Sequence, residues 1–362
     1  MLRKTWLEVD LGAIITNYQT VKKISGKEVI PVIKADAYGC GDVQVVQALT
    51  EQGISMIAVS SIEEGIHLRR YFPGSILVLG PTEPEHIPLC IGHRITINAY
   101  SNAWLEKLPE DCTGLVVHLK YDTGMNRIGF KTIEELQNAL DVLNNKHCTV
   151  EGIFTHFVNA EEDIELTYKQ YYKFEDAVRA LRYPFKYIHC DNSAASLTFQ
   201  APVSNACRLG ISMYGIPASS KVLYPAVRLY STVAMIKHIE AGESISYGAT
   251  YTSSYDEWIA TLPIGYADGL IRKNQGRLVY AGGVYGEIVG RVCMDQCMVR
   301  FPKYVPEGTV VEFFGPHISI ETMADDLGTI PYEILCGISD RVTRIYTLNN
   351  TIKAEVNSRF DH

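Results

Sequence analysis

The chain lacks the features that mark several large classes of protein. Its 362 residues contain no pronounced run of Lys or Arg, and the net charge is −8. A nucleic-acid partner is therefore not expected, because binding a phosphate backbone requires a basic surface. No stretch approaches 18 consecutive apolar residues, and the N-terminus has no signal-peptide core. The chain as given is not expected to span a membrane.

Paired cysteines are also missing. The nine cysteines are scattered, and none forms a Cys-x-x-Cys motif. Cys293 and Cys297 lie four apart, but no second ligand pair with zinc-like spacing accompanies them. Most of the cysteines lie in apolar strand contexts, as reduced core thiols do. We therefore expect no metal site, and a reducing, cytoplasmic environment.

The length predicts about two domains. In the first part of the chain, short apolar runs alternate with segments of helical period, which predicts an α/β fold. Eight parallel strands with crossover helices favour a closed (β/α)8 barrel of the TIM type over residues 1–228. The expected strands are 28–34, 56–60, 76–80, 95–98, 115–121, 150–156, 186–190 and 206–212, and the clearest helices are 43–51, 62–71, 133–144 and 168–182.

After residue 228, frequent glycines and alternating apolar positions predict a mostly-β domain over 229–362. The opening strand, 5–10, could pair either with the first barrel strand or with this β-domain. The strands expected in the β-domain are 232–237, 244–251, 258–262, 278–280, 287–301 and 309–314.

Lys34 ends the first barrel strand and precedes a Gly-rich turn. The carboxyl ends of barrel strands hold the active sites of such folds. A partly desolvated lysine amine can be deprotonated near neutral pH and form a Schiff base. Tyr38 follows four residues later, where its hydroxyl could meet a phosphate.

Other charged and polar residues lie at the ends of strands distant in sequence. Each alone could be a satisfied polar residue, but a barrel interior does not tolerate unpaired charges. Several charges on one rim must pair with one another or with a ligand. Besides Lys34, these residues are Lys120, Tyr121, Asp122, His156, Asn192, Ser193 and Arg208.

Two of these tracts suit an anion. Residues 191–196 resemble a helix start with free N–H groups, and residues 208–211 contain Gly210, where a ligand can approach the backbone closely. Late-strand loops and helix N-termini are common phosphate sites in barrels. A Schiff-base lysine and a phosphate site on one rim indicate pyridoxal phosphate.

The chain contains an ordered series of motifs, which are VIKADAYG (32–39), KYDTGMNRIG (120–129), THF (155–157), NSA (192–194), RLGI (208–211), SYG (246–248), GYADG (265–269) and VCMDQ (292–296). In these motifs and their order, the chain resembles the alanine racemases over nearly its full length.

The resemblance implies a fold-type-III pyridoxal-phosphate enzyme, a homodimer whose active sites combine one barrel with the partner's β-domain. It implies that Lys34 and Tyr247 are the two catalytic acid/base residues and that Lys120 is carbamylated. The carbamate would fix Arg127, which contacts the cofactor and substrate. The other cofactor-binding residues would be Lys34 itself, Tyr38, His156, Ser193, Arg208, Gly210 and Ile211, and Met294 would join Arg127 in binding substrate.

Racemisation moves a proton off one face of Cα and onto the other, so one base is needed on each face. An ordinary tyrosine, with a pKa near 10, needs a positive group nearby to act as a phenolate at neutral pH. Arg208 and His156 would supply that environment.

The sequence departs from the family at two places. Cys40 stands between two glycines where alanine racemases usually have His, which we interpret as variation outside the site. Asp340 stands where they usually have a tyrosine that lines the substrate cavity. A smaller, polar residue at this position favours a substrate whose side chain carries a hydroxyl group. We therefore expect Asp340 to contact the substrate. Arg341 or Arg344 could hold its carboxylate.

On this basis the sequence predicts a racemase of L- and D-serine and of L- and D-alanine. It is similar to the serine racemase domains of vancomycin-resistance systems, which follow a membrane-embedded domain; the chain could be the cytoplasmic part of such a protein. The alternatives are a plain alanine racemase acting in peptidoglycan supply, a pyridoxal-phosphate-dependent basic amino-acid decarboxylase, and a non-enzymatic pyridoxal-phosphate carrier. The decarboxylases have an acidic group at the cofactor's pyridine nitrogen, where the resemblance places Arg208. The carrier proteins have no β-domain, whereas one is predicted here over 229–362.

Overall fold

The computed structural model describes residues 1–217 and 220–359, and the chain divides into two compact units. The barrel unit comprises Ile15–Ala37 and Asp42–Met213. The β-domain unit comprises Met1–Ile14, Tyr38–Gly41 and the described residues from Tyr214 onward.

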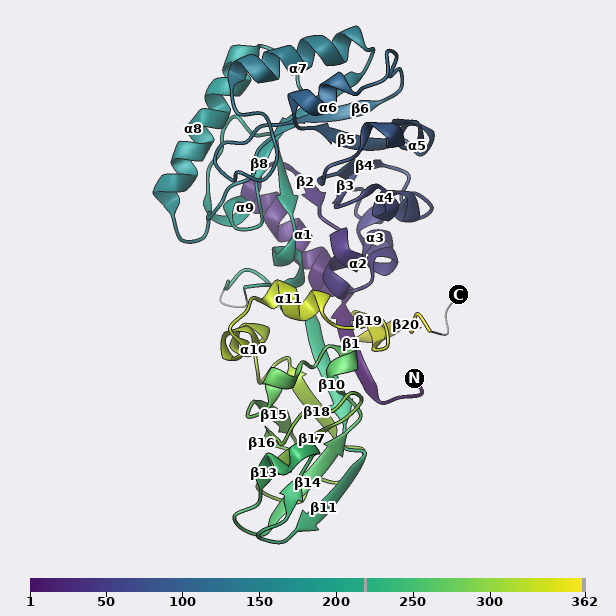
Figure 1. Cartoon of the computed structure of the whole chain (residues 1–362), viewed down its shortest axis with the longest axis vertical. Coiled ribbons are helices and arrows are strands. Elements are labelled where there is room, and N and C mark those ends of the chain that lie inside the picture. The colour runs from purple at the N-terminus through teal and green to yellow at the C-terminus, as the bar shows by residue number, and fades with distance from the viewer. Residues whose placement is uncertain (218–219, 360–362) are drawn as a thin grey trace. The chain divides into compact units, whose positions relative to one another are not determined.

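The barrel unit contains the eight expected strands, all parallel, in the order β2-β9-β8-β7-β6-β5-β4-β3 (Figure 1). A bridge between Val32 and Ala58 joins the two ends of this order, so the barrel is nearly closed. The (β/α)8 prediction is confirmed. The strands are β2 (Glu28–Pro31), β3 (Met56–Val59), β4 (Ser75–Val78), β5 (Ile95–Ala99), β6 (Val116–Lys120), β7 (Thr149–Phe154), β8 (Tyr187–Asp191) and β9 (Ala206–Leu209).

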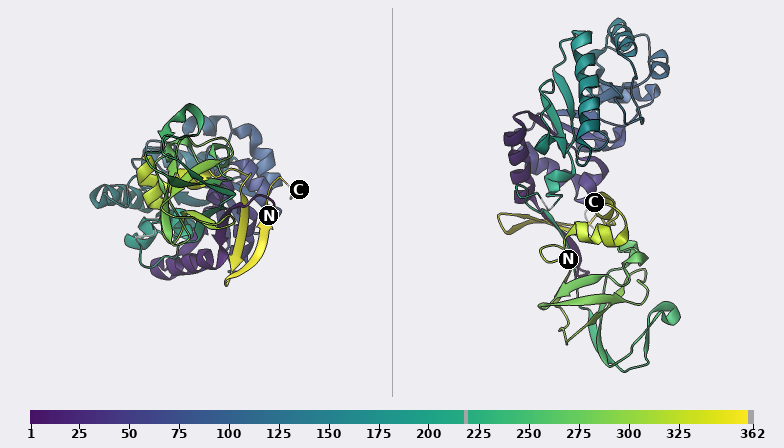
Figure 2. Two further views of the ribbon diagram at one scale, coloured as in Figure 1. Left: turned by 90° about the horizontal axis from the view of Figure 1, so that it is seen from below. Right: turned by 90° about the vertical axis from the view of Figure 1, so that its left-hand side faces the viewer.

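The four helices expected from periodicity are present within a few residues at each end. Local sequence explains the start of the helix at Ile133: the Thr132 hydroxyl accepts the amide of Glu135, whose carboxylate accepts the amide of Thr132 in return, which is a capping box. Figure 2 gives two further views of the strands and helices. The helices of this part are α1 (Leu11–Ser25), α2 (Lys34–Gly39), α3 (Asp42–Thr50), α4 (Ile62–Leu68), α5 (Ile87–Gly92), α6 (Asn102–Glu106), α7 (Ile133–Asn145), α8 (Ile164–Leu181) and α9 (Ala195–Thr198).

The first barrel strand is shorter than predicted, because it ends at Pro31 and Lys34 begins α2. Residues 35–38 all have φ between +53° and +58°, so α2 is a left-handed turn. Left-handed helical backbone costs non-glycine residues about 1–2 kcal/mol each. Such strain persists where other contacts fix it, typically at functional sites.

The β-domain unit is built on a ten-stranded sheet in the order β11-β14-β17-β16-β15-β18-β10-β1-β19-β20. β1 (Thr5–Asp10) pairs antiparallel with β10 and parallel with β19, so the opening strand belongs to this sheet and not to the barrel. The other strands are β10 (Val227–Thr232), β11 (Met235–Ile239), β14 (Glu257–Leu262), β15 (Leu278–Ala281), β16 (Val284–Val289), β17 (Cys297–Phe301), β18 (Val310–Phe314), β19 (Thr343–Leu348) and β20 (Thr351–Val356).

Three predicted β-domain strands are wrong in detail. The predicted strand 232–237 spans the break between β10 and β11, and 287–301 is two strands separated by a loop. The predicted strand 244–251 consists of β12 (Ser244–Ile245), a 3₁₀ turn (Tyr247–Ala249) and the start of β13 (Tyr251–Thr252). Two helices, α10 (Ile320–Leu327) and α11 (Pro331–Cys336), were not predicted.

Within the described residues, no helix has the length and apolar character needed to cross a membrane.

Candidate active site

Five of the predicted site residues line one cavity of about 290 Å³ in the barrel unit, which we call the barrel cavity. Lys120 and Phe154 are the last residues of β6 and β7, so the cavity opens at the carboxyl ends of the strands. Four cationic side chains and no carboxylate are among the described residues that line it, which suits an anionic ligand. The lining residues are Lys34, Ser60, Leu79, Gly80, Pro81, Lys120, Arg127, Ile128, Phe154, His156 and Arg208.

Arg208 is buried, and its guanidinium is held entirely by neutral acceptors. Its Nη1 donates to Nδ1 of His189 at 2.8 Å and to the His189 carbonyl at 3.0 Å. Its Nη2 donates to the carbonyl of Thr155 at 2.7 Å and to Nδ1 of His156 at 3.2 Å. Within the described part of the chain no carboxylate lies within ion-pair distance of Arg208, so its charge is available to a ligand.

His156 is kept neutral by its surroundings. Burial and the nearby charge of Arg208 hold its pKa well below the usual value. Because arginine can only donate, Nδ1 of His156 must accept, and the ring proton is on Nε2. His156 can therefore act as a hydrogen-bond donor, and it contributes no positive charge.

Lys120 is buried between other cations. Burial, reinforced by Arg208, lowers the pKa of its amine to about 7. The neighbouring carboxylate of Asp122 is bound instead by Lys131, at 2.7 Å, and by the amides of Gly124 and Asn126. The amine of Lys120 is thus partly neutral at physiological pH, which is the form that reacts with carbon dioxide.

The loop after β6 returns Arg127 to the barrel cavity. The amide of Phe130 donates to the carbonyl of Lys120 at 2.9 Å, and the amide of Asp122 donates to the carbonyl of Phe130 at 2.8 Å. These bonds close the loop on the end of β6. Lys120 and Arg127 therefore line the same cavity although seven residues separate them.

The left-handed turn after Lys34 is fixed by two carboxylates. Glu64 accepts the amide of Ala35 at 2.8 Å and the amide of Ser60 at 2.6 Å. Asp36 accepts the amide of Asp42 at 2.9 Å. Lys34 is half-buried at the start of this turn, so these contacts set where its side chain enters the cavity.

Ser193 and the segment after β9 form the predicted phosphate site. The amides of Gly210 and Ser212 both point at the Ser193 hydroxyl, at 2.9 and 3.5 Å. Ile211 lies between them. A hydroxyl together with converging amides is a group of donors suited to an anion. Together with the cationic barrel cavity, these donors fit pyridoxal phosphate.

Tyr38 belongs to the β-domain unit, where its ring packs between those of Tyr214, at 5.5 Å, and Tyr332, at 6.0 Å. Burial raises the pKa of its hydroxyl, so Tyr38 keeps its proton and can donate a hydrogen bond. The turn that contains it is held by Arg344, which donates to the carbonyl of Gly39 at 2.9 and 3.1 Å.

Tyr247 and Met294 line one open groove of about 900 Å³ in the β-domain unit. Tyr247 is 72% exposed and Met294 is 53% exposed. Tyr247 lies on a 3₁₀ turn between Ser246, with φ of +67°, and Gly248, with φ of +75°. Ser246 donates to the carbonyl of Arg291 at 2.6 Å, which ties the turn to the loop that carries Met294.

Asp340 is held by a different arginine from those predicted. Its Oδ1 accepts from Arg359 at 3.1 Å and from the Ser339 hydroxyl at 3.2 Å, and the side chain is 55% exposed. Arg341 instead binds Asp295 at 2.6 Å. Among the described residues, Arg344 donates only to backbone carbonyls.

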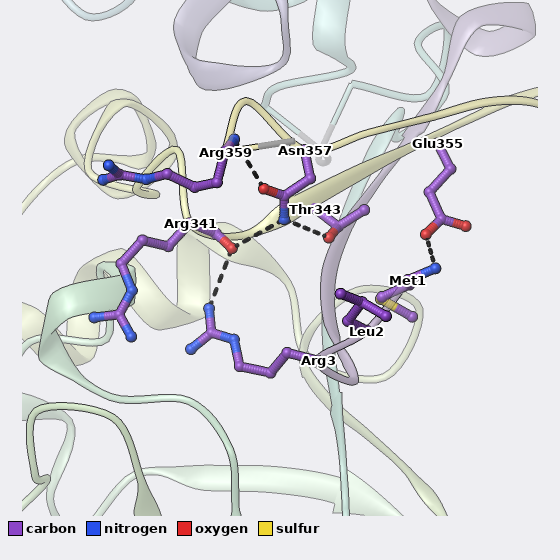
Figure 3. A pocket seen from close by; sticks show the side chains of 8 residues that line it. All are labelled: Met1, Leu2, Arg3, Arg341, Thr343, Glu355, Asn357 and Arg359. Atoms are coloured by element: carbon purple, nitrogen blue, oxygen red, sulfur yellow. Dashed lines mark hydrogen bonds and ion pairs between the residues drawn. The ribbon is translucent and has the colours of Figure 1, made fainter. Parts of the chain in front are cut away.

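A second cavity of the β-domain unit, of about 690 Å³, is lined by three of its arginines (Figure 3). Each guanidinium already has a carboxylate partner: Arg3 binds Asp268, Arg341 binds Asp295 and Arg359 binds Asp340. The charges are balanced, so this cavity is a poor anion site. No cluster of three or more potential metal ligands occurs among the described residues.

Sequence reasoning missed three residues that support the site. Glu64 holds the turn after Lys34, and its role depends on a contact 29 residues away. His118 and His189 lie inside the barrel behind Arg208. For His118 a signal existed, because it precedes Lys120 by two positions on one strand and so faces the same side.

The comparisons with known proteins agree with the motifs. The profile of the alanine racemase N-terminal domain matches residues 9–218, and that of the alanine racemase C-terminal domain matches residues 226–346. The alanine racemase of Staphylococcus epidermidis is 41% identical over 367 residues, covering 96% of both chains. Alanine racemase 1 of Bacillus subtilis is also 41% identical, over 97% of this chain and 95% of its own.

Solved structures show the same fold. Alanine racemase from Bacillus anthracis with bound L-Ala-P has a TM-score of 0.93 and 37% identity, over 99% of each chain. The Clostridium difficile enzyme in complex with cycloserine has a TM-score of 0.87 and 35% identity, also over 99% of each chain. The predicted family and cofactor are thereby confirmed. The chain belongs to the alanine racemase family of pyridoxal-phosphate-dependent enzymes.

Proposed function

We propose that this protein interconverts L- and D-alanine. The observation that carries the proposal is the barrel cavity, in which Lys34, Lys120, Arg127 and Arg208 gather without a carboxylate among the described lining residues. The relatives are named alanine racemases, which supports alanine ahead of the serine preference predicted from sequence.

Lys34 and Arg208 would have different roles in this reaction. Pyridoxal phosphate, when bound, withdraws electrons and so acidifies the Cα–H of the amino acid. Lys34 would hold the cofactor covalently and exchange a proton with one face of Cα. Arg208 cannot give up its proton, so it would offer the cofactor's ring nitrogen a hydrogen bond without protonating it. This would limit side reactions that need a stronger electron sink.

The second base would be Tyr247 of a partner subunit. Its exposure in the β-domain groove leaves the hydroxyl accessible to another molecule. The Nε2–H of neutral His156 would donate to the Tyr247 oxygen in the composite site. The protein would therefore act as a homodimer with composite sites, in which Met294 and Arg127 position the substrate carboxylate.

The test is isotope incorporation. With L-alanine in D₂O, we expect deuterium at Cα of both enantiomers and conversion to an equal mixture of L- and D-alanine. Release of carbon dioxide from a basic amino acid would instead indicate a decarboxylase. A cofactor spectrum without any exchange at Cα would indicate a carrier.

Carbamylation of Lys120 gives a pH-dependent prediction. The neutral amine adds carbon dioxide, forming an N–C bond and releasing one proton, and the product is an anion among cations. Loss of the carbamate takes up that proton again. Below about pH 7, the lowered pKa of the Lys120 amine, the released amine takes up a second proton, so acid favours loss of the carbamate and higher pH retains it when little carbon dioxide is present. We expect activity to fall when carbon dioxide is removed at pH 6, and to fall much less after the same treatment at pH 8.

Lys120→Ala should lose activity at both pH values, and added acetate should restore part of it by supplying the anion. An intact-mass spectrum of fully active protein with an unmodified Lys120 would contradict the prediction.

Serine is a second candidate substrate, supported by Asp340. Both of its hydrogen bonds use Oδ1, and Oδ2 has no partner among the described residues, so Oδ2 could accept the hydroxyl of serine. A site that hydrogen-bonds a hydroxyl discriminates against an analogue that lacks it.

We expect kcat/KM to be higher for alanine than for serine, and Asp340→Tyr to lower the serine-to-alanine ratio by about 5- to 30-fold, the range for one lost hydrogen bond. Asp340→Asn keeps an acceptor of similar size and should retain most of that ratio. If Asp340→Tyr leaves the ratio unchanged, Asp340 does not select the substrate.

A further inference from the structure

A line of buried polar side chains runs through the barrel interior behind Arg208. The ring of His189 on β8 contacts Arg208 through Nδ1 at 2.8 Å and His118 on β6 through Nε2 at 2.9 Å. Both imidazoles are fully buried. On the far side of His118, the carboxylate of Glu151 lies 3.6 Å from Nε2 and also accepts from Lys186 at 2.8 Å.

The direction of every hydrogen bond in this line is determined by Arg208. A guanidinium has no acceptor, so Nδ1 of His189 must carry a lone pair and the His189 proton must be on Nε2. That proton points at Nδ1 of His118, which must accept in turn. The remaining His118 proton is therefore on Nε2, on the side of Glu151. Both rings are neutral, in agreement with the lowering of their pKa values by burial.

Two residues of the neighbouring strand β7, Phe154 and Gly152, pack closely against these imidazole rings. His189 stacks on Phe154, with ring centroids 4.9 Å apart and planes 3° from parallel. Gly152 is the β7 residue opposite His118, and a Cβ at that position would lie 2.7 Å from Nδ1 and Cε1 of the ring. A glycine is needed there because any side chain would displace the imidazole.

These contacts also determine which N–H group of the Arg208 guanidinium is available to a ligand. Its Nη1 and Nη2 groups are occupied by His189, Thr155, His156 and the carbonyl of Cys190. Only the Nε–H has no partner among the described residues, and Arg208 lines the barrel cavity. If His189 lost its tautomer, the guanidinium could rotate and present a different donor.

We propose that His118 and His189 are positioning residues, a hydrogen-bonded relay that fixes the guanidinium of Arg208 and presents its Nε–H to the cofactor, with the carboxylate of Glu151 acting on His118 from 3.6 Å through its charge. The hydrogen bond from His189 to His118 makes His189 a better acceptor for Arg208, and the negative charge of Glu151 adds to this effect from a distance, so the buried cation is stabilised without a carboxylate beside it. The proposal rests on the proposed function only in naming what Arg208 serves; the relay itself is a property of the resting protein.

Two substitutions at one position separate this role from simple packing. His118→Gln retains an acceptor for the Nε2–H of His189, whereas His118→Leu fills similar space and removes it. We expect His118→Gln to keep kcat close to that of the native enzyme. His118→Leu should lower kcat by about 5- to 30-fold, as for one lost buried hydrogen bond, with little change in KM. The thermal stability of the leucine variant should match or exceed that of the glutamine variant, because leucine is apolar in an apolar interior.

The direct readout is ¹⁵N NMR of histidine-labelled holoenzyme without substrate, assigned with the His118 variants and His189→Gln. We expect His118 and His189 to be neutral Nε2–H tautomers from pH 6 to pH 8, and His189 to lose that single tautomer in His118→Leu. Lys186→Gln, which removes only the outer partner of Glu151, should leave both tautomers unchanged.

A proton on Nδ1 of either ring in the native protein would overturn the relay, as would equal kcat values for His118→Leu and His118→Gln. If the tautomers are as expected but the native protein does not racemise alanine, the proposed function is wrong and the relay stands.

Discussion

Replacing Lys34 with alanine is expected to lower kcat for alanine racemisation by about 10²- to 10⁴-fold, the usual contribution of a positioned acid/base group. The same change should abolish covalent attachment of the cofactor. Lys34 is the lysine at which the strained left-handed turn begins, it lines the barrel cavity, and Glu64 fixes the backbone that follows it.

The measurement is reduction with borohydride followed by peptide mapping. In the native protein the cofactor should be found on the peptide that contains Lys34, and Lys34→Ala should carry none. Lys169→Ala, a change at an exposed lysine on α8, should leave both attachment and activity unchanged. Cofactor still covalently bound to Lys34→Ala would contradict the assignment.

The barrel could be predicted because its signals are local. Each strand is a short apolar run, four of the helices begin at a capping Ser, Thr or Asp, and parallel strands buried on both faces are nearly continuous in apolar residues. The strand-end rule then brought Lys34, Lys120, His156 and Arg208 together without knowledge of any contact.

The turn after Lys34 could not be predicted, because residues 35–38 include no glycine and nothing in their sequence marks a left-handed backbone. Their strain is compensated by contacts from elsewhere, such as the carboxylate of Glu64. The apolar run therefore continued as a strand to Lys34 in the prediction, although the strand ends at Pro31.

The strand predicted around Tyr247 was wrong for a related reason. Alternating apolar residues over 244–251 indicate a strand, but positive φ angles at Ser246 and Gly248 turn the chain, and Ser246 is bound to the carbonyl of Arg291. Local periodicity cannot register a contact 45 residues away. The same limit hid the partner of Asp340, since Arg341 and Arg344 both lie nearer to Asp340 in sequence than Arg359, which is 19 residues away.

Mixing two inactive variants is expected to restore activity if the site is composite. Lys34→Ala lacks one base, and Tyr247→Phe lacks the other while keeping the aromatic ring. In a hybrid dimer, one site would combine the native Lys34 of one subunit with the native Tyr247 of its partner, and the other site would lack both. With random exchange, roughly a quarter of the native activity should return, since half of the dimers are hybrids and each has one intact site of two.

The expected recovery depends on where the two residues lie. Lys34 lines the cavity of the barrel unit, whereas Tyr247 is 72% exposed in the groove of the β-domain unit. If one subunit supplied both residues to its own site, no hybrid would contain an intact site and mixing would restore nothing. The control pairs Lys34→Ala with the Lys34→Ala/Tyr247→Phe double variant, which should remain inactive. Mass-tagged subunits would demonstrate exchange, so that inactivity of the mixture despite full exchange would exclude the composite site.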